Sequence, residues 1–131
     1  MLDRIDIQIE VGSLTYEVLR DNTPREPSAE IRKRVERARE RMTKRYAGTG
    51  IYANGQLTPA MIREYCVTDE RADSLLKSAF ERLGLSARGY DRILRLAKTI
   101  ADMDACDIIG EKHIAQAIQL RSLDRKYWQT V

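Results

Sequence analysis

The stretch ARGYDRILRLAKTIADM, residues 87 to 103, decides the fold of this chain. Its apolar residues recur at spacings of three and four, which at about 100° per residue place them on one broad face of an α-helix. Ser86, directly before the stretch, is a residue type favoured as a helix N-cap. The width of the apolar face predicts that this helix lies at the centre of a bundle, with these residues pointing inward: Ile93, Leu94, Leu96, Ala97, Ile100 and Ala101.

Other parts of the chain also carry helical signals. Gly84 is typical of a helix C-terminus, and Thr68 is a favoured N-cap for the helix that Gly84 ends. Thr58 followed by Pro59 marks another helix start, because a proline at the first helical position gives up no hydrogen bond. The chain is therefore predicted to be an all-α helical bundle. Its expected helices include 14–21, 59–65, 110–120 and 69–83, the last with Ala72, Leu75, Leu76, Ala79, Phe80 and Leu83 inward.

The most basic helix is predicted over 29–46, with Ser28 as its N-cap. This segment has eight Lys and Arg residues against three Glu, and pairs of opposite charge four residues apart, such as Glu30 with Arg34, explain much of that charge without any ligand. The glycine-rich segment 47–57, which follows it, is expected to be a loop or a tight turn. The apolar residues of the helix form one stripe: Ile31, Val35, Ala38, Met42 and Tyr46.

The segment LDRIDIQIEV, residues 2 to 11, has the pattern of a β-strand, because apolar and polar residues alternate along it. A strand needs a neighbour to bond its backbone groups, and nothing downstream offers a comparable run. We expect its sheet to lie in a part of the polypeptide outside this chain, so that residues 1–12 are the terminal strand of an absent core and 13–131 form a helical domain. Two alternatives stay open: pairing with a short segment near Ile51 and Tyr52, or with a second copy of the chain.

Composition limits the classes of function. The 131 residues have a net charge of +3, which is too small to indicate nucleic-acid binding by itself. No apolar run is long enough to span a membrane and no signal peptide is evident, so the chain is expected to be cytoplasmic. Cys66 and Cys106 are expected to be unpaired small apolar residues. His113 is the only histidine, so no metal site is expected and His113 is predicted to pack or to cap a helix start.

Two stretches resemble a known family. LDRID followed by SAEIRKRVERARER, and LSARGYDRILRLAKTIADMD with HIAQAIQLRSLDR, are similar to the C-terminal portion of the magnesium-chelatase-like AAA+ ATPases, in the ComM-type branch. The resemblance implies a homo-hexameric ATPase whose nucleotide-binding core precedes residue 1, with this chain as the helical lid. It implies ATP and Mg²⁺ as cofactors of the full-length protein. This chain lacks the glycine-rich phosphate-binding loop, so it is expected to bind neither alone.

The resemblance also assigns roles to arginines. Arg4, in LDRID, matches the arginine finger that reaches the γ-phosphate bound by a neighbouring subunit, a catalytic role for which a planar, permanently charged donor is suited. Arg88 matches the sensor-2 arginine, through which the lid contacts nucleotide bound in the same subunit. Arg92 and Arg95 could take that role if the register is shifted by a turn. Each of these arginines could instead be an ordinary surface charge, and Arg4 could pair with a neighbouring aspartate.

The resemblance to the ComM branch further implies that the parent protein is a DNA branch-migration helicase, although the sequence leaves open whether it acts on DNA or on a protein partner. The expected partners of the chain are the core of the same polypeptide and the neighbouring subunits. A different class of function stays open, which is a stand-alone nucleic-acid-binding or assembly module using the basic helix 29–46. Interspersed glutamates weigh against that alternative, because a phosphate-binding face usually segregates its positive charge.

Overall fold

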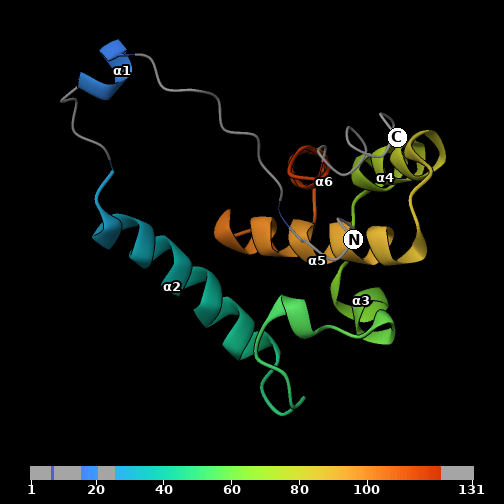
Figure 1. Ribbon diagram of the computed structural model, residues 1–131. Helices are drawn as coiled ribbons and strands as arrows, with labels where there is room; N and C mark the ends of the chain where they lie inside the picture. Colours follow the sequence, from blue (N-terminus) through green and yellow to red (C-terminus); the bar gives the residue numbers. More distant parts are fainter. Residues whose placement is uncertain (1–6, 8–15, 21–25, 122–131) are drawn as a thin grey trace.

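The structure is a computed structural model that describes residues 7, 16–20 and 26–121. Its regular elements are α1 (Tyr16–Arg20), α2 (Ser28–Arg45), the 3₁₀ turn η2 (Asn54–Gln56), α3 (Pro59–Tyr65), α4 (Glu70–Leu83), α5 (Ala87–Met103) and α6 (Glu111–Gln119) (Figure 1). Within the described ranges the only β-type pairing is one isolated bridge, and the prediction of an all-α bundle is confirmed.

The predicted strand over residues 2 to 11 lies outside the described residues except for Ile7, which is exposed. The division at residue 12 therefore stays a prediction. Ile51 and Tyr52, the segment considered as an alternative partner for that strand, have no strand structure. None of the helices in the described ranges combines the length and the hydropathy needed to cross a bilayer.

Helix α5 is the centre of the bundle, as its sequence predicts. It packs against α6, α2, α3 and η2, and it runs across the middle of the molecule in Figure 1. Ile93, Ala97 and Ala101 on its inner face are at most 1% exposed. The Ser86 side chain accepts a hydrogen bond from the Gly89 backbone N–H at 3.0 Å, which confirms the predicted cap. The core of the molecule therefore forms around the one helix whose apolar face is widest.

The N-terminus of α4 differs from the prediction by one residue. Asp69, and not Thr68, is the N-cap, since the Asp69 carboxylate accepts the Ala72 backbone N–H at 2.7 Å. Thr68 instead forms a parallel bridge with Ile109, the residue that leads into α6. At the other end Gly84 has a φ of 59°, the left-handed conformation that stops the helix as expected.

The buried face of α4 is narrower than its sequence suggests. Ala72, Leu76 and Ala79 are buried, whereas Phe80 is 43% exposed, so the prediction that Phe80 points inward is wrong. The reason is that α4 packs mainly on α6, which covers only one stripe of it. Phe80 lies at the border of that stripe, where its ring meets the Tyr90 ring edge to face at 5.9 Å.

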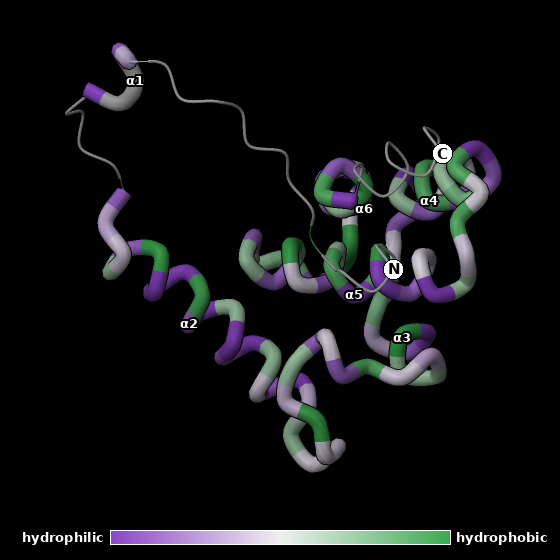
Figure 2. The backbone as a smooth tube through the Cα atoms, in the orientation of Figure 1, coloured by the Kyte–Doolittle hydropathy of each residue, from purple (hydrophilic) through white to green (hydrophobic). Residues whose placement is uncertain are grey.

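Helix α2 is divided into a packed half and an exposed half. Ala38, Met42 and the adjoining Tyr46 are buried, but Ile31 and Val35 of the same predicted stripe are exposed. The N-terminal half projects away from the bundle, with isolated hydrophobic positions among polar ones (Figures 1 and 2). The helix starts at Ser28 itself, after Pro27, and no side chain caps it, so the predicted Ser28 cap is wrong.

Candidate functional site

The first turn of α5 presents the arginine that the resemblance singles out. Arg88 is the second residue of the helix and is exposed, whereas its neighbour Gly89 is buried. Arg92, one turn further, is half-buried. Arg95 is committed to the fold, because its guanidinium donates to the backbone oxygen of Leu57 at 3.0 Å. The sensor role predicted for these arginines is not tested by these contacts and stays a prediction.

Arg4, the predicted arginine finger, lies outside the described residues. Its position and contacts are therefore not part of the geometry of this site, and its role stays a prediction.

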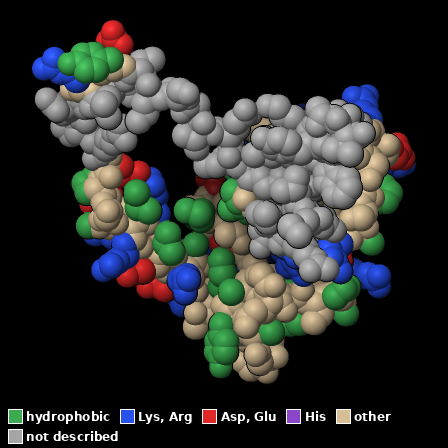
Figure 3. Space-filling model, viewed as in Figure 1, with side chains coloured by type: hydrophobic (Ala, Val, Ile, Leu, Met, Phe, Trp, Pro, Cys, Tyr) green, Lys and Arg blue, Asp and Glu red, His purple; other side chains and the backbone are tan. Residues whose placement is uncertain are grey.

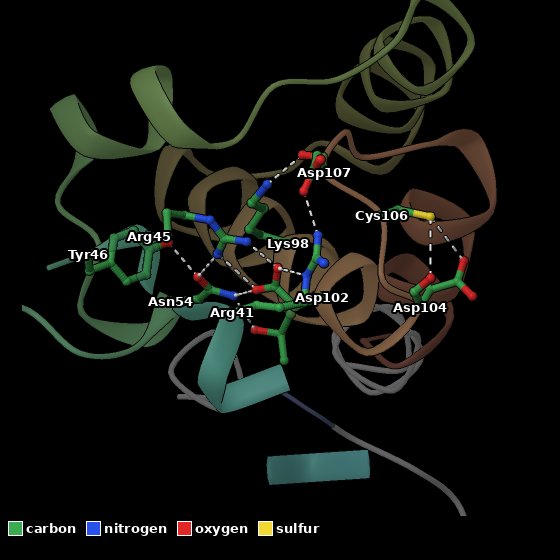
Figure 4. Close-up of polar contacts among 10 residues, drawn as sticks. Arg41, Arg45, Tyr46, Asn54, Lys98, Asp102, Asp104, Cys106 and Asp107 are labelled. Carbon is green, nitrogen blue, oxygen red and sulfur yellow. Dashed lines mark hydrogen bonds and ion pairs between the residues drawn. The ribbon is translucent and has the colours of Figure 1, made fainter. Parts of the chain in front are cut away.

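The opposite end of α5 carries a buried carboxylate. Asp102 is 2% exposed, and it binds the Arg45 guanidinium through two hydrogen bonds, one of them at 3.0 Å from Nη1 to Oδ2 (Figure 4). Asn54 donates its side-chain N–H to the same carboxylate oxygen at 2.8 Å. A buried charge is tolerated when it is paired and hydrogen-bonded in this way. We call the set Arg45, Asn54 and Asp102 the α2–α5 clamp.

Asn54, the clamp residue from the glycine-rich segment, anchors that segment to α5 and to Tyr46. Its side chain is 1% exposed; the carbonyl oxygen accepts the Tyr46 hydroxyl, and the amide also donates to Thr99 at 3.1 Å. The Gln56 side chain closes the loop locally by accepting the backbone N–H groups of Tyr52 and Ala53. The loop predicted from its glycines is thus fastened to the core by a residue that sequence reasoning did not single out.

Further charged side chains on α2 and α5 lie next to the clamp and add contacts between the two helices. The hydrogen bond that the Arg45 guanidinium donates to the Asp102 carboxylate holds the pKa of Arg45 above its usual range, and burial opposes this. Arg41, one turn earlier on α2, pairs with Asp107 at 2.5 Å and lies 3.7 Å from the Asp102 carboxylate. Burial lowers the pKa of Lys98, whose ammonium donates to the Asp107 backbone oxygen at 2.7 Å. These contacts tie the C-terminal half of α2 to α5.

A second polar cluster lies where α5 meets α6. The side-chain ligand atoms of Asp104, Cys106 and His113 lie within 4.8 Å of one another, so the structure brings the only histidine of the chain close to a cysteine and a carboxylate. The Gly110 N–H donates to His113 Nδ1 at 2.9 Å, which leaves the ring proton on Nε2, 3.0 Å from Asp104. A metal at Nε2 would require moving that proton to Nδ1, against the Gly110 N–H.

The cluster is better explained as a helix cap than as a metal centre. Lys112 lies 2.7 Å from the Asp104 carboxylate. Hydrogen bonds from Lys112, the larger effect, and from His113 hold the pKa of the Asp104 carboxyl well below its usual range. His113 is buried and accepts the N-cap N–H, which confirms the prediction that it packs and caps near a helix start. Both cysteines are free thiols, as expected, and burial raises the pKa of Cys66 to about 11.

Comparison with known proteins identifies the family. The model described as "Magnesium chelatase, subunit ChlI C-terminal" matches residues 25–121. The chain belongs to this family. The protein YifB of Escherichia coli (strain K12) is 36% identical over an alignment of 129 residues that covers 95% of this chain and 24% of YifB. The competence protein ComM of Haemophilus influenzae is 34% identical over 125 residues, again covering 95% of this chain and 24% of ComM.

The segment that matches the family model contains most of the site residues described above. Residues 25–121 include α2 through α6, and thus both the α2–α5 clamp and Arg88. The chain is a C-terminal domain of the ComM-type, magnesium-chelatase-like family. It spans 24% of the length of these relatives, so what the whole protein does is a separate question.

The clamp yields a stability prediction. Replacing Asp102 by Asn leaves the half-buried Arg45 guanidinium without its counter-charge, and we expect the free energy of unfolding to fall by about 3 kcal/mol. The matched control is Asp107→Asn, because that side chain is 92% exposed and its pairing with Arg41 is screened by water, so the loss stays under about 1 kcal/mol. Urea unfolding followed by circular dichroism measures both. Equal losses in the two variants would show that the clamp does not hold the fold.

Proposed function

We propose that this chain is the lid and sensor domain of a magnesium-chelatase-like AAA+ ATPase. The observation that carries the proposal is that a chain of this family presents an exposed arginine, Arg88, in the first turn of its central helix. The nucleotide-binding core belongs to the remaining part of the parent polypeptide, and ATP with Mg²⁺ binds there. The described residues supply a cation to the phosphates and a rigid helix that carries it.

Arg88 contacts the phosphates of nucleotide held by the core of the same subunit. A guanidinium suits this contact because it is always charged and offers several N–H donors in one plane. The bundle fixes the arginine, since α5 is anchored by its buried face and by Asp102 at its far end. A rigid lid that senses the γ-phosphate converts hydrolysis into movement of a domain. Arg92, one turn along the same helix, assists or replaces it.

Arg4 acts in trans as the arginine finger of a neighbouring subunit in a homo-hexamer. The charge that develops on the transferring phosphoryl oxygens is stabilised by such a donor. In this scheme the parent protein is a hydrolase only when assembled, and this chain alone is inactive.

The parent motor works on DNA as a branch-migration helicase. This part of the proposal rests on the similarity to the ComM branch and to the competence protein ComM itself. A stand-alone nucleic-acid-binding role for α2 is less well supported, because four of its eight basic residues already pair with carboxylates: Lys33, Arg34, Arg41 and Arg45.

Substituting Arg88 tests the sensor role. In the full-length parent protein, Arg88→Ala is expected to lower the ATPase rate or the nucleotide affinity about tenfold or more, because a charged contact to a phosphate is lost. Arg71→Ala is the matched control, since Arg71 is also the exposed second residue of a helix. Steady-state ATPase assays and nucleotide titration measure both variants, and circular dichroism checks that each is folded. Unchanged values for Arg88→Ala would remove Arg88 from the site.

Substituting Arg4 tests the finger role separately. Arg4→Ala in the full-length protein is expected to abolish ATP hydrolysis and to leave nucleotide binding near normal, because a finger stabilises charge that develops in the transition state of the neighbouring site. Mixing Arg4→Ala subunits with subunits unable to bind nucleotide should restore part of the activity, since each supplies what the other lacks. Loss of nucleotide binding in the single variant would contradict the role.

A further inference from the structure

The N-terminal half of α2 is exposed around its whole circumference. Every residue from 28 to 37 is exposed, and the first buried position of the helix is Ala38. Ile31 is 44% and Val35 is 39% exposed, although both lie on the stripe that continues into Ala38 and Met42. One apolar stripe therefore begins in solvent and ends in the core.

An uncovered stripe of this kind needs a partner. Isolated helices of this length are marginal in water, and most helical stability in proteins comes from packing an apolar face. The predicted pair of Glu30 with Arg34 is replaced by two others, since Glu30 pairs with Lys33 at 3.4 Å and Arg34 with Glu26 at 2.6 Å. Both pairs are exposed, so they do not replace that packing. Figure 3 shows hydrophobic side chains open to solvent along α2, among basic and acidic ones.

The charges beside the stripe indicate the chemistry of the partner. Arg32 and Arg39 follow Ile31 and Ala38 by one residue each, so they lie along the same edge of the stripe, about 10.5 Å apart for seven residues of helix. Neither has an ion pair with any described residue. A complementary surface presents apolar side chains to Ile31 and Val35 and carboxylates to the two arginines. Two copies of α2 would face arginine with arginine and repel.

The relatives of this chain are long enough to supply such a partner within the same polypeptide. The chain spans 24% of YifB and of ComM, and the family match begins at residue 25, three residues before α2. We propose that Ile31, Val35, Arg32 and Arg39 form a docking face for an apolar, acidic surface on the nucleotide-binding core of the same polypeptide. This inference rests on the proposed function, since it takes the core to be that of an AAA+ ATPase.

The docking face gives α2 a mechanical role. Its C-terminal half is tied to α5 by the α2–α5 clamp and by Arg41 with Asp107, and its N-terminal half rests on the core. A shift of α5 on contact with nucleotide therefore moves α2 against the core as one body. The helix joins the sensing arginine to the interface between the domains.

Hydrogen exchange tests the docking face without requiring activity. Amide exchange of residues 28–37 is measured by mass spectrometry in the full-length parent protein and in this chain alone, without nucleotide or DNA. We expect exchange about tenfold slower, or slower still, in the full-length protein, because local opening is suppressed when the stripe is covered. The amides of Ile93, Ala97 and Ala101 serve as the internal reference, since these residues of α5 are buried within the bundle of this chain. Equal exchange at residues 28–37 overturns the inference.

Charge reversal identifies the contact. Arg32→Glu with Arg39→Glu is expected to remove most of the protection in the full-length protein, whereas Lys33→Glu with Lys44→Glu, on the outer side of the same helix, should leave it. Protection that falls on dilution assigns the face to a second copy, and protection that requires added duplex DNA assigns it to nucleic acid; either result overturns the proposal. If protection is present and the parent protein neither binds nor hydrolyses ATP, the docking stands and the proposed function fails.

Discussion

The buried carboxylate of Asp102 holds three segments together: the C-terminal half of α2, the 3₁₀ turn η2 and the central helix α5. Since a charge in an apolar interior must be compensated, Arg45 and Asn54 can occupy few other positions once Asp102 is buried. Buried ion pairs of this kind often add little net stability compared with apolar packing, and their value lies in specifying one arrangement. Here they specify the angle at which α2 leaves the bundle.

That arrangement makes α5 a link between two ends of the molecule. Arg88 lies in its first turn and Asp102 in its last, 14 residues and about 21 Å apart along the helix axis. Between them the buried face of α5 contacts α2, α3 and α6, so the helix cannot shift without moving its neighbours. In the proposed function this rigidity lets one cation at a phosphate reposition the whole lid.

Sequence reasoning succeeded where the signal is local. The bounds of α5, its Ser86 cap, the start of α3 at Thr58 and Pro59, and the Gly84 stop depend on neighbouring residues, and the structure confirms all of them. It failed where distant residues decide. Thr68 is not the N-cap of α4, because its backbone pairs with Ile109 instead. Phe80 is exposed because α6 covers only one stripe of α4.

The candidate site shows the same limit. The family resemblance was enough to select Arg88 as a candidate. Its exposure, and the hydrogen bond from Arg95 to the Leu57 backbone oxygen, are seen only in the structure. Asn54 was hidden in a glycine-rich segment, and its partners lie 45 and 48 positions away. One signal was available: Asp102 lies next to Ala101 on an apolar helix face, and a carboxylate there requires a basic partner. Asp104, Cys106 and His113 are near one another in the sequence, but the turn between α5 and α6 that brings their side chains together is seen only in the structure.

The central claim is that this chain senses a nucleotide that it does not bind by itself. Equilibrium titration with a fluorescent ATP analogue in the presence of Mg²⁺, performed on the full-length parent protein and on this chain, tests the claim most directly. The account predicts saturable binding to the parent protein and none to the chain alone at the same concentrations. Binding by the isolated chain, or no binding by the parent protein, would contradict it.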